Sequence, residues 1–148
     1  MSKGDLDGAI AEFRTAIKQQ PIFPQAHYYL GLDLAVKRDW DGAIAEYRTA
    51  ISQQPNFPQT HYHLGTVLHR KGDHDGAIAE LRTAISQQPN FPEAHFTLGG
   101  VLDQKGDHDG AIAEYRTAIR QRPNFPEAQS ALDEALATKD KLGPGTPQ

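Results

Sequence analysis

Hydrophobic and polar residues follow a helical period along this chain, and helical segments alternate with turns. In residues 58–71, His61, Leu64, Gly65 and Leu68 recur at positions i, i+3, i+4 and i+7. This spacing places the four side chains on one face of a helix. The segment is therefore predicted to be a helix, and the glycine that follows it is predicted to end it.

A second helical segment begins directly after that glycine. Asp73 is expected to cap this helix with a side-chain oxygen, and Asp75 adds negative charge in the first turn, where the helix dipole favours it. The predicted buried side consists of Ala77, Ile78, Leu81, Ala84 and Ile85. Pro89 is predicted to end this helix, and Pro92 to start the next, since its fixed φ suits a first turn.

The two segments form a unit that recurs along the chain. The motif Asp-x-Asp-Gly begins at Asp5, Asp39, Asp73 and Asp107, so the period is 34 residues. A unit of this size cannot bury its apolar face alone and has to stack on its neighbours. Stacking predicts one elongated surface in place of a compact catalytic pocket.

These residues resemble the tetratricopeptide repeat family, whose pattern is aromatic-x2-Leu-Gly-x2-Tyr, Ala-x3-Phe and a closing Pro. One copy consists of His61, Leu64, Gly65, Leu68, Ala77, Leu81 and Pro89. Equivalent copies start at His27 and His95, and in all three copies histidine replaces the usual tryptophan. The resemblance implies an all-α, right-handed superhelical solenoid of antiparallel helix pairs, with about seven helices. Each histidine is expected to fill the interface between two helices.

The repeat positions divide the chain into segments. They are an N-terminal extension (1–4), a half repeat (5–23), three repeats (24–57, 58–91 and 92–125), a capping helix (126–141) and a tail (142–148) that is expected to be disordered. The half repeat contains a second helix without its first, so Phe13 and Ile17 are expected to be poorly covered. In the capping helix, Asp133 stands where the repeats have glycine and would be crowded by a following helix.

Two internal copies differ mainly on one helix face. Residues 39–72 and 73–106 differ at nine positions. Six of these, at residues 59, 62, 63, 66, 69 and 70, lie on one face of the first helix of a repeat, and that helix lines the concave groove in the proteins that this chain resembles. Outer positions such as Glu46 and Gln53, predicted to be exposed, do not differ. This contrast favours a groove diversified for binding, and drift after duplication is the alternative. The candidate groove residues are Tyr28, Tyr29, Leu32, Val36, Tyr62, His63, Thr66, His69, Arg70, Phe96, Thr97 and Asp103.

The resemblance implies a non-catalytic module that binds a peptide segment or helix of a partner protein in this groove. The expected ligand places apolar side chains near Tyr28 and Tyr29 and a carboxylate or another acceptor near His69 and Arg70, because aromatic residues and arginine commonly anchor interfaces. The alternative is a structural fragment of a longer array without a ligand, able to self-associate through its incomplete N-terminal half repeat. A further alternative is that the tyrosines only shield the joins between helix pairs.

Composition narrows the remaining function classes. The net charge of −4 supplies no positive field for a phosphate backbone, so no nucleic-acid partner is expected. The chain has no cysteine, no long apolar run and no signal-peptide core, so no membrane partner and a cytoplasmic location are expected. No metal and no cofactor are expected, because the recurring histidines lie one repeat apart. No catalytic residues are expected, since the paired aspartates are explained by helix capping.

Overall fold

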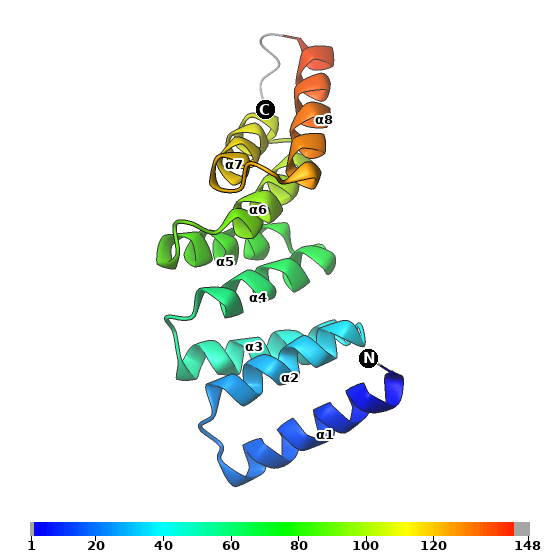
Figure 1. Ribbon diagram of the computed structural model, residues 1–148, viewed down its shortest axis with the longest axis vertical. Helices are drawn as coiled ribbons and strands as arrows, with labels where there is room; N and C mark the ends of the chain where they lie inside the picture. The colour runs from blue at the N-terminus through cyan, green and yellow to red at the C-terminus, as the bar shows by residue number, and fades with distance from the viewer. Residues whose placement is uncertain (1, 144–148) are drawn as a thin grey trace.

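The computed structural model describes residues 2–143, which form eight α-helices and no strand (Figure 1). The helices are α1 (Lys3–Gln19), α2 (Pro24–Val36), α3 (Trp40–Gln53), α4 (Pro58–Arg70), α5 (His74–Gln87), α6 (Pro92–Gln104), α7 (His108–Gln121) and α8 (Pro126–Leu142). This confirms the expected all-α architecture of about seven helices, since one half repeat, three pairs and one terminal helix add up to eight.

The helices form antiparallel pairs that stack along one axis, so the chain is a solenoid (Figure 1). The pairs are α2 with α3, α4 with α5, and α6 with α7. We call the first member of each pair the leading helix and the second the trailing helix. By position in the repeat, α8 is a leading helix and α1 a trailing helix.

Helix starts follow the sequence signals. The side chains of Asp39, Asp73 and Asp107 each accept a hydrogen bond from the backbone N–H three residues later, at 2.9 or 3.0 Å. Each leading helix, α8 included, begins at a proline. These caps fix where each helix starts, and therefore which residues point toward the neighbouring helices.

The two ends of the chain differ from expectation. The first helix begins at Lys3, not at Asp5, because Ser2 caps it and Asp5 completes a capping box by accepting from the Ser2 backbone N–H at 3.2 Å. At the other end, Leu142 still belongs to α8 and is not part of a tail. Residues 144–148, which were also expected to be disordered, lie outside the described residues.

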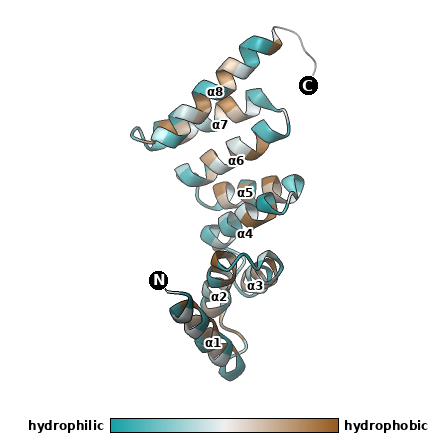
Figure 2. Cartoon of the chain, turned by 90° about the vertical axis from the view of Figure 1, so that its right-hand side faces the viewer, coloured by the Kyte–Doolittle hydropathy of each residue, from teal (hydrophilic) through white to brown (hydrophobic). Residues whose placement is uncertain are grey.

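The stack curves toward its leading helices. Each of α2, α4 and α6 contacts the leading helix of the next unit, whereas within residues 2–143 the trailing helices α1, α3, α5 and α7 do not contact one another. The leading helices therefore lie closer together, which makes their side the inner side of the curve. Turned by 90°, the solenoid shows hydrophobic and hydrophilic stretches that alternate along its helices (Figure 2).

Each helix pair packs closely at one glycine. A methyl group added at Gly99 would lie 2.5 Å from the Tyr115 ring, and one added at Gly31 would lie 2.6 Å from the Tyr47 ring. At Gly65 the nearest atom is in Leu81, at 2.8 Å. These distances leave no room for a Cβ, so the leading helix approaches its trailing partner only because glycine occupies this position.

The turn of the first complete repeat has an unusual backbone. Gly72 and Gly106 adopt φ values of 86° and 85°, in the left-handed region that glycine tolerates. The equivalent residue in the first repeat is Arg38, with φ 64°. A side chain in this conformation is unfavourable, so Arg38 costs stability where glycine does not.

We predict that Gly99→Ala lowers the free energy of unfolding by about 1 to 3 kcal/mol, because overpacking at Tyr115 outweighs the gain in helix propensity. Gly100→Ala is the matched control, since its new methyl group would meet only the Tyr115 hydroxyl oxygen at 3.9 Å. That variant is expected to be neutral or more stable. Urea denaturation followed by circular dichroism measures both, and equal effects at the two positions would contradict the packing account.

We also predict that Arg38→Gly raises the free energy of unfolding by about 0.5 to 1 kcal/mol, since relief of the left-handed strain exceeds the added entropy of the unfolded chain. The reciprocal change, Gly72→Ala, should destabilise the protein, because it creates the same strain one repeat later. The denaturant midpoints of the two variants should therefore move in opposite directions.

Candidate functional site

One hollow on the inner side lies across α4, α6 and α8. This α4–α8 hollow has a volume of about 800 Å³. Its lining is aromatic and polar, with charges of both signs, and consists of Tyr62, Thr66, His69, Arg70, Glu93, Phe96, Thr97, Gly100, Gln104, Arg122, Phe125 and Glu127. A concave surface with apolar walls and a few polar groups is typical of a ligand site.

A second inner hollow lies between α2, α3 and α4. This α2–α4 hollow has a volume of about 520 Å³. It is lined by Leu32, Ala35, Val36, Arg38, Trp40, Tyr47, His63, Thr66, Val67 and Arg70. Thr66 and Arg70 line both hollows, so the two form neighbouring sections of one surface with Arg70 between them.

Most of the candidate residues lie on this surface. The two hollows bring together Leu32, Val36, Tyr62, His63, Thr66, His69, Arg70, Phe96 and Thr97. Tyr29 lies at the N-terminal end, in a separate small hollow beside α1. Asp103 is engaged by a hydrogen bond from His108 Nδ1, at 2.6 Å. The candidate set therefore divides into a main surface and separate positions at its edges.

Tyr28 belongs to the core and not to the groove. Only 9% of its surface is exposed, and its ring lies 5.1 Å from the Phe57 ring and 5.7 Å from the His63 ring. Burial also raises the pKa of its hydroxyl. Tyr28 thus seals the join between consecutive repeats, whereas Tyr29 is 49% exposed and stacks on Phe13.

The charges in the two hollows are not equivalent. Arg122 pairs with Glu93, and its guanidinium lies 5.0 Å from the centre of the Phe125 ring. Burial raises the pKa of Glu93, but its hydrogen bond from Arg122 prevails and holds that pKa below the usual value. Arg70 is exposed and lies 5.9 Å above Trp40, and no carboxylate within residues 2–143 pairs with it. The Arg70 guanidinium is therefore free to bind an anionic group of another molecule.

His69 contacts another histidine. Its Nδ1 lies 3.1 Å from the Nδ1 of His74, across the turn between α4 and α5. Burial, together with the nearby charges of His74 and Arg70, lowers the pKa of His69. His69 is therefore neutral at pH 7 and offers a hydrogen bond, not a charge, at the edge of the α4–α8 hollow. Among the described residues no group of three metal-binding side chains occurs.

Sequence reasoning missed Arg38 and Trp40 as site residues. Both line the α2–α4 hollow, where Trp40 lies beneath Arg70. The available signal was their departure from the other copies, which have Gly72 and His74, and then Gly106 and His108. An arginine kept in a strained conformation beside a half-buried tryptophan is the kind of local exception that often marks a functional position.

The unchanged outer positions have a structural explanation. His61 is buried, its Nδ1 lies 2.7 Å from a Glu80 carboxylate oxygen, and its Nε2 lies 2.9 Å from the Pro55 carbonyl. The same carbonyl also accepts from Gln87 at 2.9 Å. The other two complete repeats contain the same arrangement. The expectation that these glutamates and glutamines are exposed was therefore wrong, because they hold each histidine and the adjoining turn in place.

This result weakens one argument for a diversified groove. The glutamate (Glu46, Glu80) and the glutamine (Gln53, Gln87) are the same in both copies because each makes a hydrogen bond that the fold uses. Their identity is therefore not evidence that the differences in the groove were selected for binding. The histidines do fill the helix interface, as expected from their position in the repeat. The case for a binding surface therefore depends on the geometry of the inner hollows.

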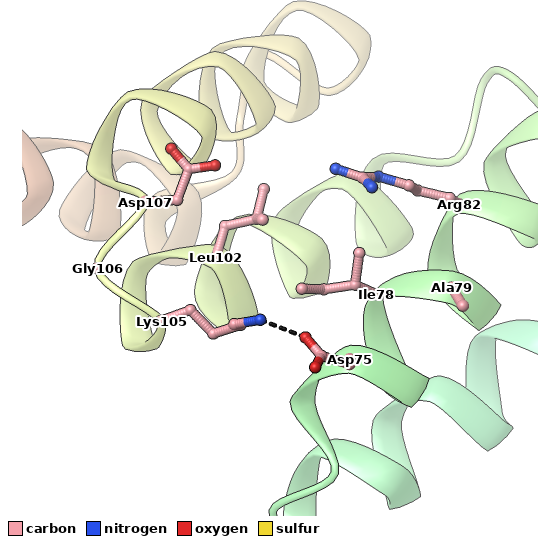
Figure 3. A pocket seen from close by; sticks show the side chains of 8 residues that line it. All are labelled: Asp75, Ile78, Ala79, Arg82, Leu102, Lys105, Gly106 and Asp107. Atoms are coloured by element: carbon pink, nitrogen blue, oxygen red, sulfur yellow. Dashed lines mark hydrogen bonds and ion pairs between the residues drawn. The ribbon is translucent and has the colours of Figure 1, made fainter. Parts of the chain in front are cut away.

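An outer hollow of about 750 Å³ lies between α5, the end of α6 and the start of α7 (Figure 3). In Figure 3, Lys105 and Asp75 point toward each other and form an ion pair across it. Each of its eight lining residues recurs unchanged one repeat earlier, at Asp41, Ile44, Ala45, Arg48, Leu68, Lys71, Gly72 and Asp73. The outer hollow is therefore a regular product of repeat stacking, whereas the inner hollows differ along the chain.

Comparison with protein families identifies the repeat. One tetratricopeptide repeat model matches residues 68–135, and a second TPR repeat model matches residues 1–32 and 37–72. The chain belongs to the tetratricopeptide repeat family. No curated protein matches the sequence of this chain.

Several solved structures share the fold. A crystal structure of MamA is 25% identical with a TM-score of 0.81, and the match covers 95% of this chain and 92% of that one. YrrB, described as a TPR protein with an unusual peptide-binding site, is 24% identical with a TM-score of 0.81, covering 95% and 72%. The first TPR domain of Spaghetti (RPAP3), bound to the HSP90 peptide SRMEEVD, is 16% identical with a TM-score of 0.76, covering 78% and 91%.

Among residues 2–143, no helix has both the length and the apolar character needed to cross a bilayer.

We predict a pH-dependent contribution from His61. The hydrogen bond to Glu80 raises its pKa above 6.5, against the opposing effect of burial. When a histidine has a higher pKa in the folded state than in the unfolded state, it stabilises the protein at pH values below its unfolded-state pKa. This contribution disappears as the pH rises through its folded-state pKa. The stability advantage of the wild type over His61→Phe should therefore be largest below pH 6.5 and decrease above it.

Thermal unfolding of both proteins between about pH 5.5 and 9 measures this difference. Glu80→Gln is the control, because an amide removes the carboxylate that raises the pKa of His61. When both proteins also carry Glu80→Gln, the stability difference caused by His61→Phe should change much less over the same pH range. A wild-type advantage that grows with pH would contradict the assigned direction.

Proposed function

We propose that this protein is a non-catalytic interaction module that binds a peptide segment or helix of a partner protein along its inner surface. The observation that carries this proposal is the position of Arg70, an arginine without a carboxylate partner among the described residues, between two hollows with aromatic walls. An unpaired guanidinium beside aromatic rings is the combination that most often anchors a protein interface.

The charged end of the ligand is inferred from the α2–α4 hollow. Arg38 and Arg70 both line it, with Trp40 and the exposed Val36 alongside. Guanidinium groups bind carboxylates through charge-assisted hydrogen bonds, which are stronger than bonds between neutral groups. An aspartate, a glutamate or a C-terminal carboxylate of the ligand is therefore expected here.

The apolar part of the ligand is inferred from the α4–α8 hollow. The Tyr62 ring packs on Phe91, and the Phe96 ring packs 5.1 Å from Phe125, which holds these walls in place. Rigid aromatic side chains lose little entropy on binding, so they suit apolar anchors of a ligand. Glu127, exposed at the α8 edge of this hollow, makes a second carboxylate unfavourable there.

Known structures with this fold support a peptide as the ligand. The YrrB structure is described by its peptide-binding site, and the Spaghetti (RPAP3) domain was solved with a peptide that contains acidic residues. At these levels of identity the likeness concerns the fold alone. The residues that bind the ligand in this chain are therefore taken from its own surface.

A peptide-display library selected on the wild-type protein tests the proposal. The selected peptides are expected to combine an acidic residue or free C-terminal carboxylate with an apolar residue. Arg70→Gln should weaken their binding by about 10-fold to 100-fold, because a charge-assisted hydrogen bond contributes about 1.5 to 3 kcal/mol. Fluorescence anisotropy with the selected peptides measures this change.

Arg82→Gln is the matched control, because Arg82 lies in the outer hollow and should not affect binding. Arg38→Gly is an informative second variant, since it should weaken binding while making the protein more stable. Peptides whose affinity falls with Arg82→Gln and not with Arg70→Gln would refute the inner surface as the site.

A further inference from the structure

The helix α1 leaves one apolar face open. By its position in the repeat, α1 is a trailing helix, and within residues 2–143 no leading helix packs on its outer side. Ala9, Phe13 and Ala16 lie on this face and are only partly buried. The equivalent residues of α3 are Ala43, Tyr47 and Ala50, which are 0%, 1% and 1% exposed. The face has the sequence of a packed interface without the helix that packs against it.

A polar group on the same face also lacks its usual neighbour. Glu12 occupies the position of Glu46, Glu80 and Glu114, each of which binds a buried histidine of its leading helix at 2.6 or 2.7 Å. In the described part of the chain no histidine has the corresponding place next to Glu12, which is exposed. The open face therefore combines an apolar strip with a carboxylate at a defined position.

The three complete repeats show what fits such a face. Each leading helix contributes a histidine opposite the glutamate, a leucine three residues later, and then a glycine opposite the large side chain of the trailing helix. At Gly31 this large side chain is Tyr47, and the equivalent residue on α1 is Phe13. A helix with any side chain at the glycine position would collide with the ring, as the distances below 3 Å in the repeats show.

We propose that the open face of α1 docks a helix of a partner protein that carries the pattern His-x-x-Leu-Gly. The glycine lies against Phe13, the leucine packs toward Ala9 and Ala16, and the histidine binds Glu12. The interface continues the repeat geometry by one step, so the chain already contains three examples of it. This surface is separate from the inner hollows and would be occupied independently of them.

The chain's own C-terminal helix does not fit this face. The helix α8 is a leading helix, yet it carries Asp133 in place of the glycine and Gln129 in place of the histidine. Asp133 is exposed and accepts a hydrogen bond from Gln129 at 3.0 Å. A carboxylate pressed against Phe13 of a second copy would be both crowded and desolvated. Asp133 therefore disfavours packing of α8 on the α1 face of a second copy.

A small hollow beside Phe13 agrees with a helix docking at this end. It has a volume of about 370 Å³ and a mainly apolar lining of Glu12, Phe13, Ala16, Phe23, Gln25, Ala26 and Tyr29. In the interior of the stack, the ring equivalent to Phe13 is Tyr47, which is covered by helices on both sides. Here Phe13 stacks on Tyr29 of α2 and is only partly buried.

A synthetic helix of known sequence tests the docking proposal. The probe is a fluorescent peptide with the sequence of residues 56–72, which contains His61, Leu64 and Gly65. It should bind the wild-type protein in a saturable manner, measured by fluorescence anisotropy. The same peptide with Gly65→Asp should bind at least tenfold more weakly, because it reproduces the aspartate found at position 133.

Variants of the protein locate the binding face. Phe13→Arg should weaken peptide binding at least tenfold, and Ala9→Gln should act in the same direction with less effect on packing. Ala11→Arg is the matched control, since Ala11 is an exposed residue of α1 outside this face. Arg70→Gln should leave binding of this helix unchanged, which separates the present proposal from the function of the inner surface.

Several results would overturn the proposal. They are equal binding of the unchanged peptide and its Gly65→Asp variant, binding that Phe13→Arg does not alter, or the absence of binding. Sedimentation velocity supplies the remaining test. The wild type should be monomeric, and a dimer that Phe13→Arg dissociates would show that a second copy is the occupant. Asp133→Gly should instead produce concentration-dependent oligomers, and Phe13→Arg should dissolve them.

Discussion

The close approach of leading and trailing helices at one glycine is the constraint on which this structure depends. A residue with a side chain at Gly31, Gly65 or Gly99 would force the paired helices apart, because a buried Tyr or Leu side chain fills the space opposite. The spacing of the pair determines how the next pair stacks, and stacking determines the curve of the solenoid. The inner hollows exist because this contact is repeated with the same geometry along the chain.

The histidine of each repeat contributes a second, polar constraint. His27, His61 and His95 connect the leading helix to a glutamate of the trailing helix and to the carbonyl of a proline in the preceding turn. One buried ring thus sets the position of three segments. The glycine contact and the hydrogen bonds of the histidine together fix how the two helices of a repeat pack. The other residues of the inner face are therefore free to vary, and the copies differ mainly on that face.

The repeat architecture could be predicted from sequence because it depends on local signals. Asp caps, prolines at helix starts and apolar periodicity act over a few residues, and each is present in several copies. Side-chain exposure was harder to predict, because it depends on which residues of neighbouring repeats meet. Tyr28 appeared to face the groove, but its ring is packed against Phe57, which caps the start of α4, and against His63 in α4. Arg38 and Trp40 were missed because Arg38 lies in the turn before α3 and Trp40 is the first residue of that trailing helix, whereas the search for binding residues followed the leading helices.

The exposed ion pairs between repeats give the solenoid a response to its solution. Lys37 pairs with Asp7 at 2.5 Å, and equivalent pairs join Lys71 to Asp41, Lys105 to Asp75 and Lys139 to Asp109. Each pair links a trailing helix to the leading helix of the following unit, not the two helices of one pair. Salt screens exposed charges but leaves apolar contacts intact. Ionic strength should therefore weaken these four contacts between units, while the apolar core that runs through all the units is unaffected.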